Sequence, residues 1–126
     1  MREDLLITLF HPVLDERVKQ LILDLKAAGH RVVCGTNAFE RHYEYHVEHG
    51  EYAVFDRVHP SHLMGVAKPS AAFYEHVLQR EGWSARGTFF IDDGEANVAT
   101  AGAMGIRSFH YTSFPLLQRW LAENLR

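Results

Sequence analysis

Short apolar segments alternate with helical patterns along most of the chain, and this alternation constrains the fold more than any other feature. The clearest apolar segment is Thr88–Ile91, which contains only β-branched and aromatic residues and ends at Asp92-Asp93-Gly94. Between Leu14 and Ala28, apolar residues instead recur at spacings of three and four, which predicts a buried helix face. Strands that alternate with helices form a parallel sheet covered on both faces. The predicted fold is therefore doubly wound α/β with a mainly parallel sheet.

The remaining predicted elements continue this alternation. Further strands are expected at residues 31–34, 57–60 and 107–111, and further helices at residues 39–49, 69–81, 96–102 and 115–125. Glycines that follow several of these segments, such as Gly29 and Gly82, are typical helix stop signals. Pro69 is expected at the first position of its helix, where a missing N–H is tolerated.

Composition excludes several classes of protein. The net charge of −3 argues against a protein that binds nucleic acids or acidic membrane surfaces, because such proteins are usually basic. No segment approaches the roughly 18 apolar residues that a membrane-spanning helix needs. The first ten residues are too acidic and their apolar run too short for a signal peptide. A single cysteine, Cys34, allows no internal disulfide, so we expect a cytoplasmic protein.

Polar side chains follow three of the predicted strands, at the sheet edge where doubly wound proteins bind ligands. Thr36 and Asn37 follow one strand, Lys68 follows the next, and Asp92 and Asp93 follow the third. Carboxylates suit a divalent cation, while an ammonium and a hydroxyl suit a phosphate. Taken singly, these features also fit a plain turn, a solvated helix-entry charge and a helix N-cap. Together they predict a site for a cation and a phosphate.

Three segments resemble motifs of the haloacid dehalogenase superfamily. Residues 33–38 (Val-Cys-Gly-Thr-Asn-Ala) resemble the second motif, Gly65–Pro69 the third and Phe90–Val98 the fourth. The resemblance runs from about Val13 to Tyr111 and keeps the order of the family's motifs. It implies a Rossmann-like core and a Mg²⁺-dependent phosphohydrolase that acts on a small phosphorylated metabolite.

The resemblance also implies a role for each residue of the site. The roles are phosphate binding and catalysis for Thr36 and Lys68, phosphate binding for Asn37, Mg²⁺ binding for Asp92 and Asp93, and support for Asn97.

The nucleophile motif of this family, Asp-x-Asp at the end of the first strand, has no match in the chain. None of the six aspartates is followed two residues later by another. Asp56 is the nearest imitation, but it matches a different Phe-Asp pair of the family. Residues 1–10 resemble the end of the helical cap. We therefore expect residues 1–12 to be a cap or linker remnant, and residues 13–126 a single core domain without its first strand.

A missing first strand would have a structural consequence. It would leave a gap of about 9–10 Å between the strands that carry Val33 and Ile91. Unpaired strand edges and apolar faces do not stay exposed. We therefore expect these two strands to pair directly, or a second chain, such as another copy, to fill the gap.

Two functions remain open at this point. The first is a phosphohydrolase that is inactive as this chain alone, with an aspartyl nucleophile supplied from elsewhere. The alternative is a non-catalytic, dimeric module that binds phosphate or a partner. A receiver-like domain fits less well, because its acidic pair lies near the first strand.

Other reactive residue types receive structural interpretations. Cys34 ends an apolar run and is interpreted as a core thiol. His42, His46 and His49 share one face of a predicted helix and could bind a transition metal. Glutamates interleave with them, which is more typical of a solvated face. His59 and His62, which flank a predicted turn, and His110, near a predicted strand, are interpreted as structural.

Overall fold

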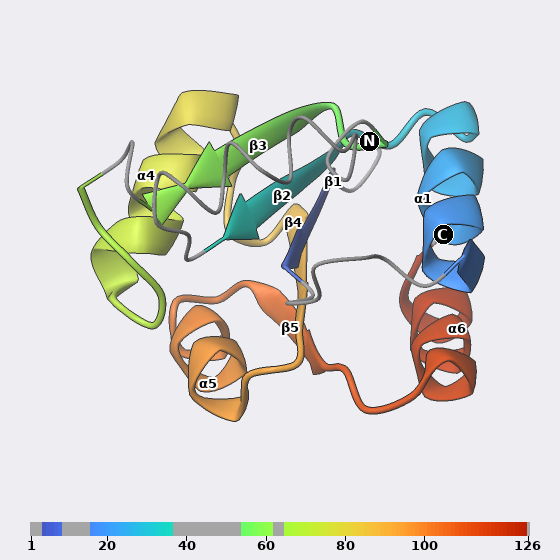
Figure 1. Cartoon of the computed structure of the whole chain (residues 1–126). Coiled ribbons are helices and arrows are strands. Elements are labelled where there is room, and N and C mark those ends of the chain that lie inside the picture. The colour runs from blue at the N-terminus through green and yellow to red at the C-terminus, as the bar shows by residue number, and fades with distance from the viewer. Residues whose placement is uncertain (1–3, 9–15, 37–53, 62–64, 126) are drawn as a thin grey trace.

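Five parallel strands form one sheet in the order β3-β2-β1-β4-β5 (Figure 1). The computed structural model describes residues 4–8, 16–36, 54–61 and 65–125. The strands are β1 (Asp4–Thr8), β2 (Val32–Thr36), β3 (Arg57–Pro60), β4 (Thr88–Asp92) and β5 (Arg107–His110). The predicted doubly wound α/β fold is confirmed.

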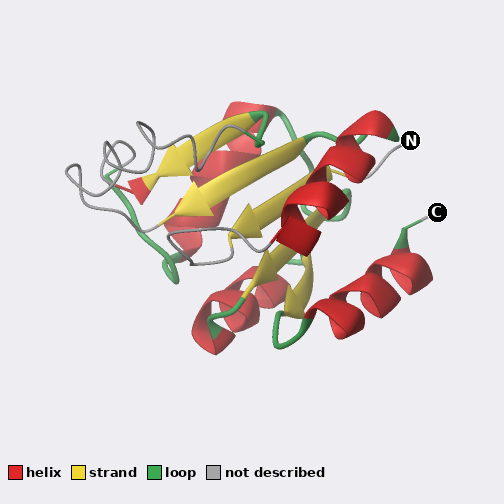
Figure 2. Cartoon of the chain, turned by 45° about the vertical axis from the view of Figure 1, so that its right-hand side comes forward, coloured by secondary structure: helices red, strands yellow, loops and turns green. Residues whose placement is uncertain are grey.

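The described helices cover both faces of this sheet. They are α1 (Glu16–Ala27), α4 (Ala71–Glu81), α5 (Glu95–Ala103) and α6 (Phe114–Asn124). Helices α1 and α6 lie on one face, and α4 and α5 on the other (Figures 1 and 2). Pro69 lies just before the N-cap Ser70 rather than at the first helical position. Among the described helices, none has the length and hydropathy that crossing a lipid bilayer requires.

Residues Asp4–Thr8 form the central strand of the sheet. Ile7 pairs with Cys34 of β2 on one side and with Ile91 of β4 on the other. The prediction that the centre of the sheet lacks a strand, so that its neighbours close up or accept a second chain, is therefore wrong. The physical reason is in the sequence, because Leu5, Leu6 and Ile7 form a continuous apolar run of the kind that suits a strand between two covered faces.

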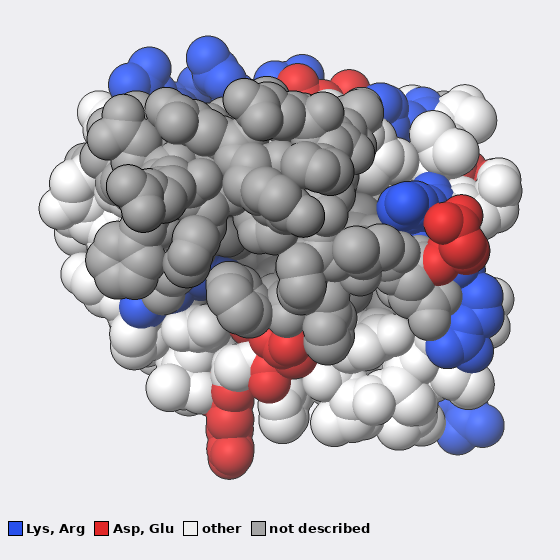
Figure 3. Space-filling model, viewed as in Figure 1, with Lys and Arg blue, Asp and Glu red and all other residues white. Residues whose placement is uncertain are grey.

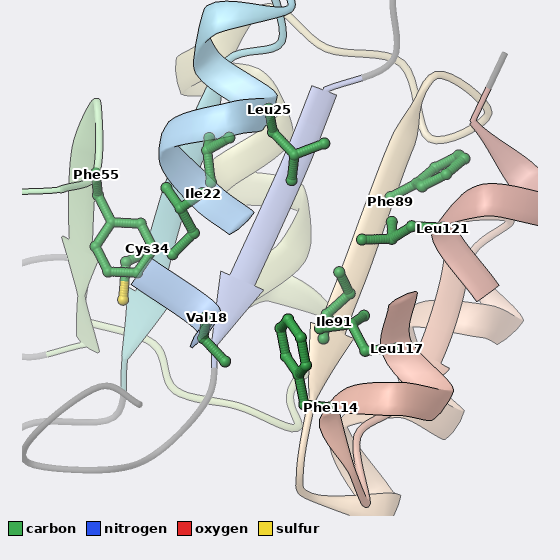
Figure 4. Close-up of a cluster of buried hydrophobic side chains, with 11 residues drawn as sticks. Val18, Ile22, Leu25, Cys34, Phe55, Phe89, Ile91, Phe114, Leu117 and Leu121 are labelled. Carbon is green, nitrogen blue, oxygen red and sulfur yellow. The ribbon is translucent and has the colours of Figure 1, made fainter. Parts of the chain in front are cut away.

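The core has two parts, one on each face of the sheet. Side chains alternate along β4, so that Phe89 and Ile91 pack toward α1 and α6 while Phe90 packs toward α4 and α5. Figure 4 shows the first part, in which Ile22 and Leu117 are fully buried. Each such side chain contributes about 1.5–3 kcal/mol through removal from water. Both faces of β4 are thus covered, which accounts for its apolar composition.

Candidate functional site

The site lies where the strand order reverses, at the carboxyl ends of β1 and β4. β1 connects onward to β2 on one side of the sheet, while β4 lies on its other side. In doubly wound sheets this reversal opens a crevice in which ligands bind. Asp92 is the last residue of β4 and pairs with Thr8, the last residue of β1.

The Asp92 carboxylate is fully buried and surrounded by N–H donors. Lys68 Nζ donates to Oδ2 at 2.9 Å, and the Gly94 backbone N–H donates to Oδ1 at 2.6 Å. The Asn97 side-chain amide lies 3.3 Å from each oxygen. These donors fix the orientation of the carboxylate. The structure thus brings Lys68 and Asp92 together at the expected edge of the sheet and adds Asn97 to them, while the roles of all three stay predictions.

Lys68 and Asp92 form a buried ion pair. Their side chains are 3% and 1% exposed. A buried ion is tolerated when a partner and hydrogen bonds replace its hydration, and removing one partner leaves the other uncompensated. The pair therefore holds an ammonium group beside the strand ends at which ligands bind.

Asn97 reaches Asp92 because residue 94 is a glycine. Asn97 lies in the first turn of α5, directly after the acidic loop. A Cβ atom on Gly94 would lie 2.7 Å from Asn97 Nδ2 and 3.2 Å from Asp92 Oδ1. A larger residue at position 94 would thus push the amide away from the carboxylate.

Tyr74 is a member of this network that the sequence did not predict. Its hydroxyl donates to the Asn97 backbone oxygen at 2.9 Å, and its side chain is fully buried. Burial, with a smaller contribution from the negative charge of Asp92, raises the pKa of Tyr74 above its ordinary value of 10. The hydroxyl therefore stays protonated and donates. Its only sequence signal was its place in the helix that follows Gly65–Pro69.

Asp93 differs from Asp92 in its surroundings. It is partly exposed, and its backbone oxygen accepts a hydrogen bond from His110 Nε2 at 3.1 Å. Figure 3 shows acidic side chains at the surface in the region of α5, whose first turn carries the exposed Glu95. Carboxylate oxygens at a solvent-accessible strand end suit Mg²⁺.

Asp92 and Asp93, the predicted Mg²⁺ ligands, lie together where β4 ends. Both oxygens of Asp92 already accept hydrogen bonds, one of them from an ammonium. The described part of the chain contains no cluster of three or more histidine, cysteine or acidic side chains able to hold a metal ion. Further ligands would therefore come from substrate, water or residues beyond the described ranges.

Thr36 ends β2 at the same edge of the sheet. β1 lies between β2 and β4, so the backbones of Thr36 and Asp92 lie about two strand spacings, or 9–10 Å, apart. Direct pairing of β2 with β4 would have brought Thr36 and Asp92 closer together, but β1 separates the two strands. Several predicted residues lie outside the described ranges: Asn37, His42, His46, His49 and His62.

Asp4 and Asp56 also lie at strands, but not at this site. Asp4 begins β1, at the end opposite Thr8. Asp56 Oδ2 accepts the backbone N–H of Val32 at 2.8 Å, at the amino end of β2. Both residues therefore lie at the wrong edge of the sheet to attack a ligand bound beside Asp92.

Cys34 and His59 are structural, as predicted. The Cys34 thiol is buried, and its burial raises its pKa to about 12, so it stays protonated. His59 is also buried, and its Nε2 lies 2.9 Å from Glu81 Oε2. A protonated thiol is a poor nucleophile, so the structure gives Cys34 no nucleophilic role.

The chain is similar to proteins of one hydrolase family. The family model for haloacid dehalogenase-like hydrolases matches residues 2–105. A sesquiterpene phosphatase from Aspergillus oryzae is 38% identical over 99 residues, which cover 78% of this chain and 50% of that protein. The chain thus spans about half the length of that relative.

Two solved structures share the fold. A protein of unknown function from Corynebacterium glutamicum superposes with a TM-score of 0.81 and 22% identity, covering 100% of this chain and 98% of that one. An enzyme of the same family from Bacteroides thetaiotaomicron, an Asp-to-Ala variant in complex with magnesium and inorganic phosphate, superposes with a TM-score of 0.71 and 23% identity. That match covers 82% of this chain and 58% of the other.

Proposed function

Because the chain belongs to the haloacid dehalogenase-like hydrolase family, we propose that it forms the phosphate-binding and cation-binding part of a phosphohydrolase core. The observation that carries the proposal is the buried Lys68–Asp92 pair at the reversal of strand order. The substrate class is a small phosphorylated metabolite, in keeping with the phosphatase relative.

In this proposal each residue of the site has a separate task. Lys68 offsets the charge of the phosphoryl oxygens, and Asp92 holds the ammonium in place. Asp92 and Asp93 bind Mg²⁺, and Asp92 also shapes the turn that follows β4 by accepting the Gly94 N–H. Thr36 and Asn37 bind the phosphate from the neighbouring strand end. Bound Mg²⁺ would polarise a phosphoryl oxygen and neutralise developing charge.

We further propose that these 126 residues alone do not turn substrate over. The described carboxyl end of β1 is Thr8, and no aspartate occurs between it and Asp15. The nucleophile would then belong to residues outside this sequence. The alternative, a non-catalytic phosphate-binding or interaction module, is favoured by the same observation.

Ligand binding tests the proposal directly. We expect the chain to bind inorganic phosphate in the presence of Mg²⁺ in calorimetry. Lys68→Met should weaken binding at least about tenfold, because a charge-assisted contact is lost. Glu75→Gln, on an exposed position of α4, is the control and should bind as the wild type does. Absence of phosphate binding, or wild-type binding by Lys68→Met on a folded chain, would refute the proposed site.

A gain-of-function variant separates the two functions. Thr8→Asp combined with Phe10→Asp introduces the Asp-x-Asp spacing from the end of β1 onward, where Thr8 pairs with Asp92. We expect Mg²⁺-dependent hydrolysis of an aryl phosphate by this variant, and none by the wild-type chain or by Thr8→Asn combined with Phe10→Asp. A variant that binds phosphate but stays inactive supports the non-catalytic module. Turnover by the wild-type chain that Asp93→Asn abolishes would show that the chain already supplies its own nucleophile.

A further inference from the structure

The polypeptide and three hydrogen bonds link Lys68, Tyr74, Asn97 and Asp92 in a ring. Tyr74 follows Lys68 by six residues along the chain, in α4, and its hydroxyl donates to the Asn97 backbone oxygen in α5 at 2.9 Å. The Asn97 amide donates to Asp92, and Asp92 accepts from Lys68 at 2.9 Å. The first turns of α4 and α5 are therefore tied to the carboxyl end of β4.

The surroundings of Tyr74 hold its hydroxyl in one place. Its ring packs edge-on against Phe73 and Phe90, with centroid distances of 5.4 and 5.2 Å. Such edge-to-face contacts restrict the ring, and the side chain has no exposed surface. A hydrogen bond in surroundings of low dielectric constant is stronger than one in water, which favours the contact with Asn97.

We propose that Tyr74 is a positioning residue of the phosphate site. Its hydroxyl fixes the first turn of α5 so that the Asn97 amide stays on Asp92, and Asp92 in turn holds the Lys68 ammonium. Tyr74 does not touch the ligand itself. This inference rests on the proposed function, because its main consequence is a change in phosphate affinity.

Removal of one hydroxyl tests this role. We expect Tyr74→Phe to weaken the binding of inorganic phosphate, measured with Mg²⁺ on the full chain, by about threefold to tenfold. Loss of a group that hydrogen-bonds directly to a ligand-binding residue typically lowers affinity about tenfold or more. Tyr74 lies one contact further from the ligand, so a smaller loss of affinity is expected. Wild-type affinity in folded Tyr74→Phe would overturn the inference.

Thr88 provides a matched control for a purely structural effect. Its hydroxyl donates to the Ser84 backbone oxygen at 2.7 Å, and it is also fully buried, but it lies at the amino end of β4. Thr88→Val should lower the melting temperature about as much as Tyr74→Phe does and leave phosphate affinity unchanged. Equal losses of affinity in both variants would contradict a positioning role.

A ligand-free measurement keeps the inference separate from the proposed function. Hydrogen exchange of the Asn97 side-chain amide, followed by NMR, should accelerate at least about threefold in Tyr74→Phe and stay unchanged in Thr88→Val. If the wild-type chain binds no phosphate, the proposed function fails, and the exchange rate alone decides whether Tyr74 holds the Asn97 amide on Asp92. Unchanged exchange in Tyr74→Phe would then overturn it.

Discussion

At the scale of single residues, the site depends on charges that are kept out of water. Lys68 and Asp92 are almost completely buried and lie 2.9 Å apart. Desolvation of two such ions costs several kcal/mol, so their attraction and the bonds from Gly94 and Asn97 largely offset that cost. The intact pair therefore contributes little net stability to the fold. Its position at the ligand-binding edge of the sheet points instead to a role in function.

Breaking this pair should destabilise the chain strongly. Asp92→Asn removes the carboxylate that lies 2.9 Å from the Lys68 ammonium, and we expect the free energy of unfolding to fall by about 3–5 kcal/mol. Urea denaturation measures the loss. Glu16→Gln is the control, because the Glu16–Lys19 pair is exposed and should contribute about 0.5 kcal/mol. A loss below about 1 kcal/mol in Asp92→Asn would contradict the buried pair.

His59 and Glu81 form a second polar cluster, away from the site. Burial is the largest cause that lowers the pKa of His59, and the hydrogen bond with Glu81 opposes it only in part. Burial tends to raise the pKa of Glu81, but bonds from Arg31 and His59 outweigh this and lower it. A buried neutral histidine resists protonation, whereas in the unfolded chain it protonates near pH 6.5.

Stability should therefore fall in mild acid. Since the pKa of His59 is lower in the folded state, its contribution is complete above about pH 6.5 and is lost as the pH falls below that value. Urea denaturation at pH 8 and pH 5.5 measures this loss. His59→Gln, which cannot protonate, should lose less stability between these values than the wild type. Equal losses would show that His59 does not carry the effect.

At the scale of helices and strands, much of the fold was predictable from pattern. β3 was predicted with its observed bounds, and the predicted helix at residues 115–125 is observed one residue earlier, as α6. The predicted helix at residues 39–49 lies outside the described ranges. Local periodicity sufficed for these elements because each depends on its own sequence.

The central strand and the Tyr74 contact were not predictable in the same way. The apolar run in Asp4–Thr8 was interpreted as the end of a cap, because it lacks the aspartates that mark the family's first strand. Only its pairing with both β2 and β4 distinguishes the two interpretations. Likewise, Tyr74 meets Asn97 through the packing of α4 against α5, which no local pattern reports.

Two glycines near α5 should respond oppositely to alanine. Gly102 lies inside the helix and an added Cβ meets nothing within 4 Å, so Gly102→Ala should stabilise the chain by about 0.5–1 kcal/mol. Gly94→Ala should displace the Asn97 amide and weaken phosphate binding, while Gly102→Ala should not. Thermal unfolding and calorimetry of both variants measure these effects. Equal phosphate affinities in the two variants would contradict the close approach at Gly94.

At the scale of the whole molecule, the sheet is organised around its first strand. β1 is the one described strand through which the β3–β2 pair is joined to the β4–β5 pair. A break in its ladder would separate the two halves of the sheet. The stability of the fold should thus depend on β1 more than on either edge strand.

A proline in β1 tests this dependence. Leu6 pairs with Val33 and Phe90, and Leu6→Pro removes a backbone donor from the middle of the sheet. We expect loss of cooperative thermal unfolding, followed by circular dichroism, and self-association in light scattering through the released strand edges. Leu6→Val, which suits a strand, should remain folded and monodisperse. A folded, unassociated Leu6→Pro variant would show that β1 is dispensable.

The position of β1 in the chain also has a consequence for synthesis. β1 can meet β2 early, but its other partner, β4, begins more than 80 residues later. At about 5–20 residues per second, a ribosome needs roughly 4–16 seconds to produce that distance. Throughout this interval one edge of the apolar first strand has no partner from its own chain, and non-local parallel pairing is intrinsically slow. Nascent copies of this protein should therefore depend on chaperones or low local concentration during translation, even though the finished sheet is closed at its centre.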